Sequence, residues 1–115
     1  MAGAVLGALA VALGAFGAHG LKERLAVDRL EIFEVGVRYQ MYHALALLLV
    51  ATMLRTTPEA AQRPTLCFVV GTIIFSGSLY ALALGAPRWF GAITPLGGLA
   101  LIGGWITLAL AARNA

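Results

Sequence analysis

The sequence predicts an all-α integral membrane protein built as a four-helix bundle. Hydrophobic residues make up 61% of the 115 residues and charged residues 11%, whereas soluble proteins are about half apolar and a quarter charged. Four apolar stretches, residues 2–20, 37–54, 65–85 and 92–112, are each close to the ~20 residues that cross a hydrocarbon layer of ~30 Å. Because a backbone in lipid must satisfy its own hydrogen bonds, these stretches are predicted to be four transmembrane helices.

Length and charge limit the remaining choices. A chain of this size is one domain, residues 1–115, with no room for a separate soluble module. The net charge of +3 comes from scattered basic residues, which indicates neither nucleic-acid binding nor strong capture of anionic lipid. The single cysteine, Cys67, allows no intrachain disulfide. No basic segment precedes the first apolar run, which argues against a cleaved signal peptide.

The first span is rich in glycine and alanine. Gly3 and Gly7 are four residues apart, and Gly14, Gly17 and Gly20 are three apart, so we expect another helix backbone to approach this helix closely. A phosphate-binding loop is disfavoured, because such a loop follows a strand and these glycines lie within a span.

A short interfacial extension is predicted before the second span. Asp28 is expected to cap a helix, with Glu31 three residues later completing a variant of the capping box. A helix from there through the second span would be about 39 Å long, longer than the membrane core. Its first turns would place Glu34 and Arg38 near the headgroups and His43 about 8 Å deeper than Arg38.

The third span follows two prolines. Thr57 and Pro58 are typical of a cap and first helical residue, opening a single turn that Pro64 is expected to interrupt. Small residues at four-residue spacing within the span are typical of a close helix contact. They are Gly77, Ala81 and Gly85.

The last connection contains Trp89 and Phe90, which suit an aromatic anchor at the membrane interface. Thr94 and Pro95 repeat the cap-plus-proline pattern, so the fourth regular helix is expected to start there and to span about 27 Å. Residues 91–93 are then expected to be irregular backbone covered by protein or water.

Polar residues gather toward one side of the membrane. We call side B the side of the first and third connections, and side A the side of the middle connection and both termini. The residues that approach side B are His19, Glu34, Arg38, Tyr39, Gln40, His43, Ser76, Ser78, Tyr80 and Thr94. Because polar groups are costly in hydrocarbon, they should face one another or water, which predicts a polar recess in the B-side half. The A-side threonines are expected to bond their own helices; they are Thr52, Thr65, Thr72 and Thr107.

Two interpretations of this recess stay open. Glu34 with Arg38, and Tyr39 with His43, are four residues apart and share a helix face. They could form a site for a small ligand, ion or proton, in which His43 titrates near neutral pH and Arg38 holds an anionic group. Alternatively, Glu34 and Arg38 form an interfacial ion pair and His43 is hydrogen-bonded between helices. His19 suits either a helix-end dipole partner or a ligand.

Catalytic and metal sites are not predicted. Two histidines and one cysteine on three different helices lack metal-ligand spacing, so we expect no metal and no cofactor. No acidic residue lies near Ser76 or Ser78 in the sequence, so the parts of a hydrolase triad are missing and the chain is not expected to be an enzyme.

Four motifs together resemble a known family: FGAHGL at residues 16–21, RYQMYHAL at 38–45, FSGSLY at 75–80 and ITPLGG at 93–98. The family is the small membrane-protein family named domain of unknown function 423, which includes relatives called transmembrane protein 256. The resemblance implies a four-helix protein, in bacteria of the inner membrane, with no established activity. Its motifs coincide with the polar residues of the predicted recess.

The leading functional hypothesis is a membrane protein that binds or passes a small polar ligand, ion or lipid headgroup in this recess. The alternative is a small structural or accessory subunit of a larger membrane complex. Helix faces rich in glycine and alanine would then dock a partner or a second copy of the chain. Membrane lipid is expected to contact the remaining surface. Five basic residues on side B against three on side A favour side B in the cytoplasm and both termini outside.

Overall fold

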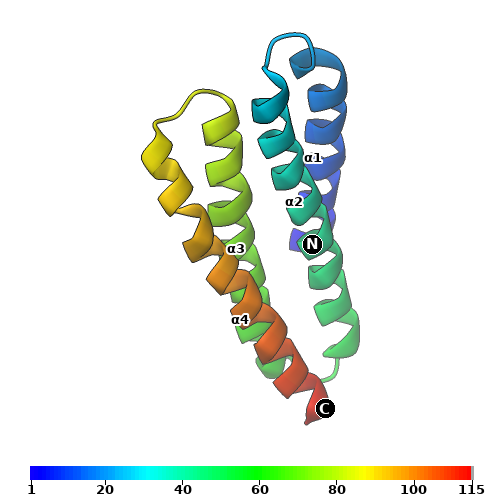
Figure 1. The fold of residues 1–115 in the computed structure, drawn as a ribbon. Coiled ribbons are helices and arrows are strands. Elements are labelled where there is room, and N and C mark those ends of the chain that lie inside the picture. The colour runs from blue at the N-terminus through cyan, green and yellow to red at the C-terminus, as the bar shows by residue number, and fades with distance from the viewer. Residues whose placement is uncertain (115) are drawn as a thin grey trace.

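The structure is a computed structural model that describes residues 1–114. Four long helices are joined by short connections, which confirms the all-α prediction (Figure 1). In chain order the elements are α1 (Ala2–Phe16), the π-helical turn η1 (Gly17–Leu21), α2 (Val27–Met53), α3 (Pro58–Ala83), the short 3-10 helix η2 (Arg88–Ala92) and α4 (Thr94–Arg113).

The helices pack as an open, flattened bundle. Within residues 1–114, α1 packs on α2, α2 on α3 and α3 on α4, while α1 and α4 share no substantial interface. The Cα atoms extend over 48 × 27 × 15 Å. Figure 1 shows the α1–α2 and α3–α4 hairpins side by side, with their connections at the same end, which is side B. This arrangement leaves a groove between α1 and α3.

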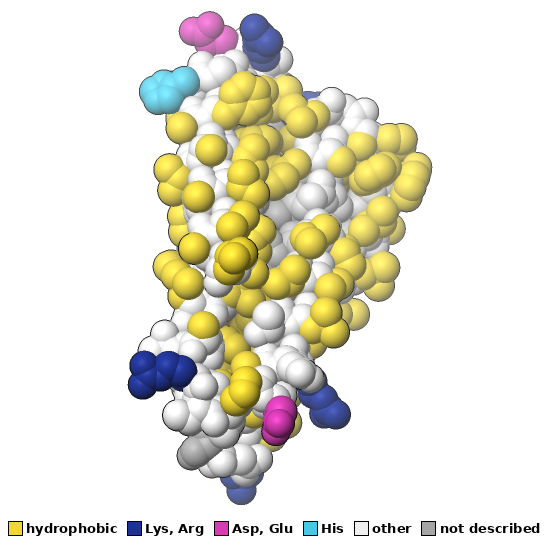
Figure 2. All heavy atoms as spheres, turned by 180° about the vertical axis from the view of Figure 1, so that it is seen from behind, with side chains coloured by type: hydrophobic (Ala, Val, Ile, Leu, Met, Phe, Trp, Pro, Cys, Tyr) yellow, Lys and Arg dark blue, Asp and Glu magenta, His cyan; other side chains and the backbone are white. Residues whose placement is uncertain are grey.

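The outer surface suits a membrane. Within residues 1–114, three helical segments are long and apolar enough to cross it: Ala2–Leu21, Pro58–Ala83 and Arg88–Arg113. Figure 2 shows hydrophobic side chains covering the middle of one face, with charged side chains at its two ends. α2 has 27 residues, about 40 Å, but its polar side chains keep it outside this set of three.

The start of α2 differs from the sequence prediction. Ala26, not Asp28, is the capping residue, and Asp28 lies in the first helical turn without a side-chain capping bond. The amide of Leu30 donates to the carbonyl of Ala26, so the first turn closes before Asp28 could cap it. The predicted capping box is therefore wrong, although the Asp28 carboxylate still lies where the helix dipole favours a negative charge.

The prediction that Pro64 interrupts the third helix is also wrong, because α3 continues through this buried proline. Proline removes one backbone amide and crowds the preceding turn. Inside a helical membrane protein, neighbouring helices and small local adjustments let a helix tolerate that loss. Thr57 does precede the helix as predicted, with Pro58 in the first turn.

The end of α3 is a Schellman motif. Gly85 has a φ of 110°, a conformation that favours glycine. The amide of Gly85 donates to the carbonyl of Leu82, and that of Ala86 donates to the carbonyl of Ala81 at 2.8 Å. Gly85 therefore terminates the helix by its backbone conformation, and the predicted span 65–85 ends at Ala83.

The approach to α4 is more regular than predicted. Residues expected to be irregular belong largely to η2, Arg88–Ala92. Ile93 is the capping residue, and Thr94 is already the first residue of α4, with Pro95 in the first turn. The predicted role of Thr94 as the cap is therefore wrong by one residue, because η2 leads into α4 with helical backbone at Ile93.

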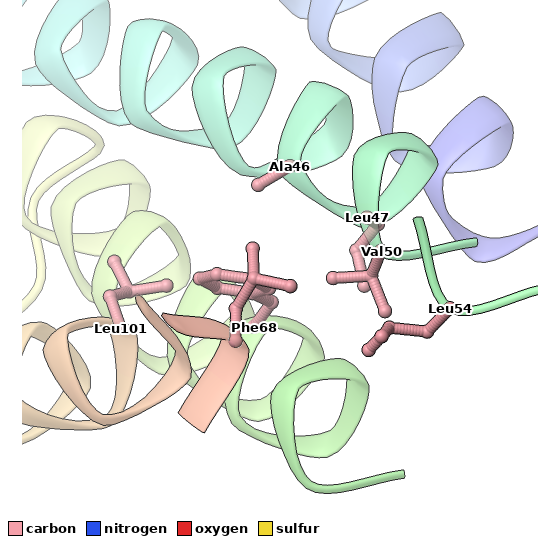
Figure 3. Packing of buried hydrophobic residues seen from close by; sticks show 7 residues of the cluster. Ala46, Leu47, Val50, Leu54, Phe68 and Leu101 are labelled. Carbon is pink, nitrogen blue, oxygen red and sulfur yellow. The ribbon is translucent and has the colours of Figure 1, made fainter. Parts of the chain in front are cut away.

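Apolar side chains fill the A-side end of the bundle. Figure 3 shows Val50 and Leu54 near Phe68 of α3, and Leu101 of α4 on the other side of that ring. Phe68 is completely buried. A smaller cluster at side B joins the buried side chains of Leu21 and Phe33 with Ala83. These two clusters pack the hairpins together, and hydrogen bonds between polar side chains lie between the clusters.

Glycines set the closest helix contacts. A Cβ on Gly3 would lie 2.7 Å from the Ala44 carbonyl oxygen, and one on Gly17 would lie 3.0 Å from the Phe33 ring. The expected close approach to the first helix is thus confirmed. The ridge predicted on α3, Gly77, Ala81 and Gly85, does not form a close helix contact within the described chain. A Cβ on Gly77 would meet nothing within 4 Å there.

Candidate functional site

The structure divides the predicted polar recess into separate places. Gln40, His43, Ser76 and Ser78 are buried, and Tyr80 and Thr94 are partly buried. Four of the predicted site residues are exposed: His19, Glu34, Arg38 and Tyr39. Position along each helix therefore does not by itself predict which of these polar side chains lie together.

The first group joins three helices through Gln40. Its Nε2 donates to the carbonyl oxygen of Leu6 on α1 at 2.8 Å. Its Oε1 accepts a hydrogen bond from the hydroxyl of Tyr80 on α3 at 2.6 Å. Because Gln40 lies at the middle of α2, one carboxamide links α1, α2 and α3 halfway along that helix.

Ser76 adds a second link between α2 and α3. Its hydroxyl donates to the Gly36 carbonyl oxygen at 2.7 Å. Gly36 also makes room for the Tyr80 ring, since a Cβ there would lie 2.7 Å from a ring carbon. The same ring packs on Phe33 with centroids 5.0 Å apart. Gly36 thus lets Tyr80 lie close enough to reach Gln40.

A groove of about 500 Å³ opens beside this group, between α1 and α3. We call it the α1–α3 groove; Leu6 and Phe16 line it from α1, Gln40 from α2, and Thr72, Gly77 and Tyr80 from α3. The other residues that line it are apolar or serine, and no Lys, Arg, His, Asp or Glu is among them. The groove is therefore an apolar channel with a few hydrogen-bonding groups along its wall.

Thr72 leaves a hydroxyl unpaired at this groove. Its side chain is 2% exposed, and its Oγ1 has no hydrogen-bond partner within the described chain. Thr52 and Thr107, by contrast, each donate at 2.9 Å to the carbonyl four residues earlier. The expectation of bonding to the own helix is confirmed for these two and wrong for Thr72. A buried hydroxyl without a partner costs about 1 to 3 kcal/mol.

The second group surrounds His43. The indole Nε1 of Trp105 donates to His43 Nε2 at 3.1 Å, and since an indole nitrogen is only a donor, Nε2 must accept. The His43 Nδ1 then carries the proton and donates to the Tyr39 carbonyl oxygen at 2.7 Å. Both ring nitrogens are used, as in the alternative of a histidine bonded between helices. A separate groove of about 330 Å³ lies over these rings.

The third group joins α3 to the start of α4. The hydroxyls of Ser78 and Thr94 are hydrogen-bonded to each other. Ser78 also donates to the carbonyl oxygen of Phe75 at 2.9 Å, so Thr94 is the donor between the two hydroxyls. This pair ties the two helices and has no spare hydroxyl hydrogen for a ligand.

The charged residues lie elsewhere. Glu34 and Arg38 share one face of α2, as expected, and line a notch of about 230 Å³ between α1 and α2. Both are exposed, as is His19 on η1. No cluster of three or more metal-ligating side chains occurs among residues 1–114.

Two residues that matter here, Trp105 and Thr72, were not among the residues of the predicted recess. Trp105 could have been found, because an indole N–H inside a span needs an acceptor and a neutral imidazole such as that of His43 can supply one. Thr72 could not, since the sequence does not reveal whether a threonine bonds its own helix. Only the spatial arrangement shows that its hydroxyl is buried without a partner in the described chain.

Comparison with known proteins relates the whole chain to bacterial membrane proteins. Residues 13–98 match the family described as "protein of unknown function (DUF423)". The chain is 44% identical over 112 residues to the UPF0382 membrane protein YwdK of Bacillus subtilis, covering 96% of this chain and 91% of the relative. It is 43% identical over 106 residues to a UPF0382 membrane protein of Staphylococcus haemolyticus, covering 92% and 87%.

A more distant relative gives a location. The chain is 37% identical over 110 residues to the UPF0382 inner membrane protein YgdD of Escherichia coli, covering 95% of this chain and 84% of the relative. No solved structure matches the present one.

Proposed function

The chain belongs to the DUF423 family of bacterial membrane proteins, and on that premise we propose that it crosses the inner membrane four times and binds a ligand from the lipid phase. The α1–α3 groove is the proposed binding site. This narrows the hypothesis of a small polar ligand or headgroup to a molecule that enters sideways from the membrane and lies between α1 and α3.

Burial of its polar side chains supports α2 as the fourth span. Gln40 and His43 are 4% and 5% exposed, and both are hydrogen-bonded to other helices. Groups so paired avoid most of the cost of entering hydrocarbon. The exposed Arg38 lies toward side B, from which a long side chain can reach the headgroups.

Reporter fusions at the two termini test the number of spans. Four spans place both termini on the same side of the membrane, and the distribution of basic residues favours the outer side. Fusion of alkaline phosphatase, which is active only outside, should give activity at both ends, and fusion of green fluorescent protein should give fluorescence at neither. Opposite results at the two ends would show that α2 does not cross.

The size and lining of the α1–α3 groove carry the ligand proposal. The groove has the size of small-molecule sites, which run from about 300 to 1,000 Å³. Its apolar lining and its few convergent polar groups are also typical of such sites.

Filling the groove tests this proposal. Gly77→Leu adds bulk where a Cβ meets nothing within 4 Å of the described chain, so the protein should fold with its groove occupied. Ala109→Leu is the matched control, because Ala109 is exposed on α4 outside the groove. Native mass spectrometry of protein extracted in mild detergent should show a bound molecule in wild type and in the control but not in Gly77→Leu. Identical spectra for all three proteins would contradict the proposal.

A docking role is the second candidate, and one observation favours it. Gly77 lines the open groove with space above it, as in faces where small residues let a second helix come close. In that case a transmembrane helix of a second copy or a partner occupies the groove. Gly77→Leu would then reduce the size of the particle in mild detergent, measured by light scattering, while the Ala109→Leu particle keeps the size of wild type.

A further inference from the structure

We propose that the notch between α1 and α2 binds the headgroup of a phospholipid that carries both a phosphate and a primary ammonium, as phosphatidylethanolamine does. This α1–α2 notch shares no lining residue with the α1–α3 groove, so the inference does not depend on a ligand in that groove. The residues that line the notch are Gly14 and Gly17 from the first span and Phe33, Glu34, Val37 and Arg38 from α2. One acid and one base in the same lining suit a ligand that carries both charges.

Glycines form one wall of the notch. A Cβ on Gly14 would lie 3.3 Å from the Val37 side chain, and one on Gly17 would lie 3.0 Å from the Phe33 ring. Glycine at both positions therefore lets the first span lie close to α2 and leaves no side chain on this wall. The notch has a volume of about 230 Å³, below the ~300 Å³ at which sites for whole small molecules begin. This volume suits a headgroup whose acyl chains stay in the surrounding lipid.

The two charged residues are attached just inside the membrane boundary. The 20 residues of Ala2–Leu21 are about 30 Å long, which is the thickness of the hydrocarbon layer, so the end of this segment marks the boundary at side B. Gly14 contacts Val37 and lies about 10 Å before that end. Arg38 is therefore attached inside the hydrocarbon layer, and Glu34 is attached about 6 Å nearer to side B along α2.

The direction of α2 brings both charges to the level of the headgroups. α2 begins at side B (Figure 1), and the Cα–Cβ bonds of a helix tilt toward its N-terminus. The long side chain of Arg38 can therefore extend its guanidinium toward side B, in the direction of the Glu34 carboxylate. Both side chains are exposed, so a headgroup can reach their charged atoms.

The order of the two charges matches the order of the groups in the ligand. In a phospholipid the phosphate is joined to the glycerol at the membrane boundary, and the ammonium is at the free end. Arg38 is attached deeper, so its guanidinium meets the phosphate, to which it can donate two parallel hydrogen bonds. Glu34 is attached nearer to water and accepts from the ammonium. A phosphatidylglycerol headgroup, by contrast, offers no cation to Glu34.

Two phospholipids that differ only in their headgroups test the inference. Delipidated full-length protein in detergent is titrated with dioleoyl phosphatidylethanolamine and with dioleoyl phosphatidylglycerol, and native mass spectrometry measures the bound fraction of each. The ratio of the two affinities should favour the ethanolamine lipid about two- to fivefold more in wild type than in Glu34→Gln, as expected for one exposed ion pair. Glu31→Gln is the matched control, because it removes the same charge from an exposed residue of α2 outside the notch, and it should keep the ratio of wild type.

A second pair of variants tests the phosphate contact. Arg38→Gln should weaken the binding of both lipids, since both contain a phosphate. Arg88→Gln, which removes an exposed charge outside the notch, should bind both lipids as wild type does. Far-UV circular dichroism of each variant checks that its helix content equals that of wild type.

Three results would overturn the inference. The first is an equal ratio for wild type and Glu34→Gln, or an equal fall of the ratio in Glu31→Gln, because the ammonium would then not meet Glu34. The second is unchanged binding of both lipids to Arg38→Gln. The third is a ratio that changes in Gly77→Leu, since Gly77 lines the α1–α3 groove and not the notch; the lipid would then lie in the groove.

Competition with O-phosphoethanolamine separates a lipid from a free zwitterion of the same chemistry. This soluble molecule has the phosphate and the ammonium but no acyl chains. The proposal predicts that it displaces phosphatidylethanolamine only at concentrations far above that of the lipid. Displacement at equal concentration would mean that the notch takes the soluble molecule and would overturn the assignment to a lipid.

Discussion

The α3–α4 interface and the α1–α3 groove use glycine in opposite ways. At the interface, an added Cβ on Gly97 would collide with the backbone of Phe75, and one on Gly104 would lie 2.6 Å from the ring of Phe68. Beside the groove, a Cβ on Gly77 would meet nothing within 4 Å of the described chain. One region is closed because glycine lets two helices touch, whereas the other is open because no helix fills the space above its glycine.

The two regions also differ in what holds their helices together. α3 and α4 interlock through aromatic and leucine side chains in glycine notches, such as Leu101 against Gly71. α1 is separated from α3 by the groove, and Gln40 of α2 bonds to both of them. Lipid supplies no hydrophobic force between helices. Close packing therefore stabilises the α3–α4 contact, and the hydrogen bonds of Gln40 help to hold α1 and α3 to α2.

The largest expected effect is at the closed interface. Gly97→Ala should destabilise the folded protein by about 3 kcal/mol, at the upper end for overpacking, because the obstructing atoms belong to the Phe75 backbone and cannot rotate away. Equilibrium unfolding in detergent measures this change. Gly98→Ala is the control, since its Cβ would lie 3.8 Å from the Phe75 ring. Equal stability of the two variants would show that the interface is looser than described.

Removal of the polar link should have a smaller effect. Gln40→Leu should cost about 1 kcal/mol, within the range measured for hydrogen bonds between membrane helices, because Tyr80 loses its acceptor. A double-mutant cycle with Tyr80→Phe measures the coupling. The second substitution should add little in a Gln40→Leu background. Fully additive losses would mean that the two side chains act independently.

Trp105→Phe tests the second polar group. It should lower stability by about 0.6 kcal/mol, the average for such bonds, because it removes the donor to His43 and keeps an aromatic ring beside Phe68. Trp89→Phe is the matched control, since Trp89 is 63% exposed. The same unfolding assay compares them. A larger loss for Trp89→Phe would contradict the assigned role of Trp105.

The smallest loss of stability is expected at the groove. Gly77→Ala should not lower the free energy of unfolding and should raise it by about 0.5 to 1 kcal/mol, because alanine favours a helix over glycine by that amount and its Cβ meets nothing within 4 Å of the described chain. Together with Gly97→Ala it forms the sharpest comparison of the two regions. A loss as large as that of Gly97→Ala would mean that the groove is closed in the folded protein.

The sequence predicted the helical architecture well, because long apolar runs and the need for backbone hydrogen bonding leave little choice. It was less successful at the ends of helices. The Asp28 cap and the Pro64 break failed because tertiary contacts and neighbouring turns decide whether a local signal is used. Pro64, for example, is buried within the continuous helix α3.

The candidate site was predicted only in part. Helical spacing correctly placed Glu34 with Arg38 on one face, but it could not show which helices are neighbours. For that reason Gln40 and His43, three residues apart on α2, were assigned to one recess although Gln40 lines the α1–α3 groove and His43 bonds to α4. The groove depends on which helices do not touch, and hydrophobic runs and helical spacing do not reveal that.

A density map of the protein in a lipid nanodisc tests the central claim most directly. The account predicts elongated density in the α1–α3 groove, beside Gly77. A map in which α1 packs directly against α3 would contradict it.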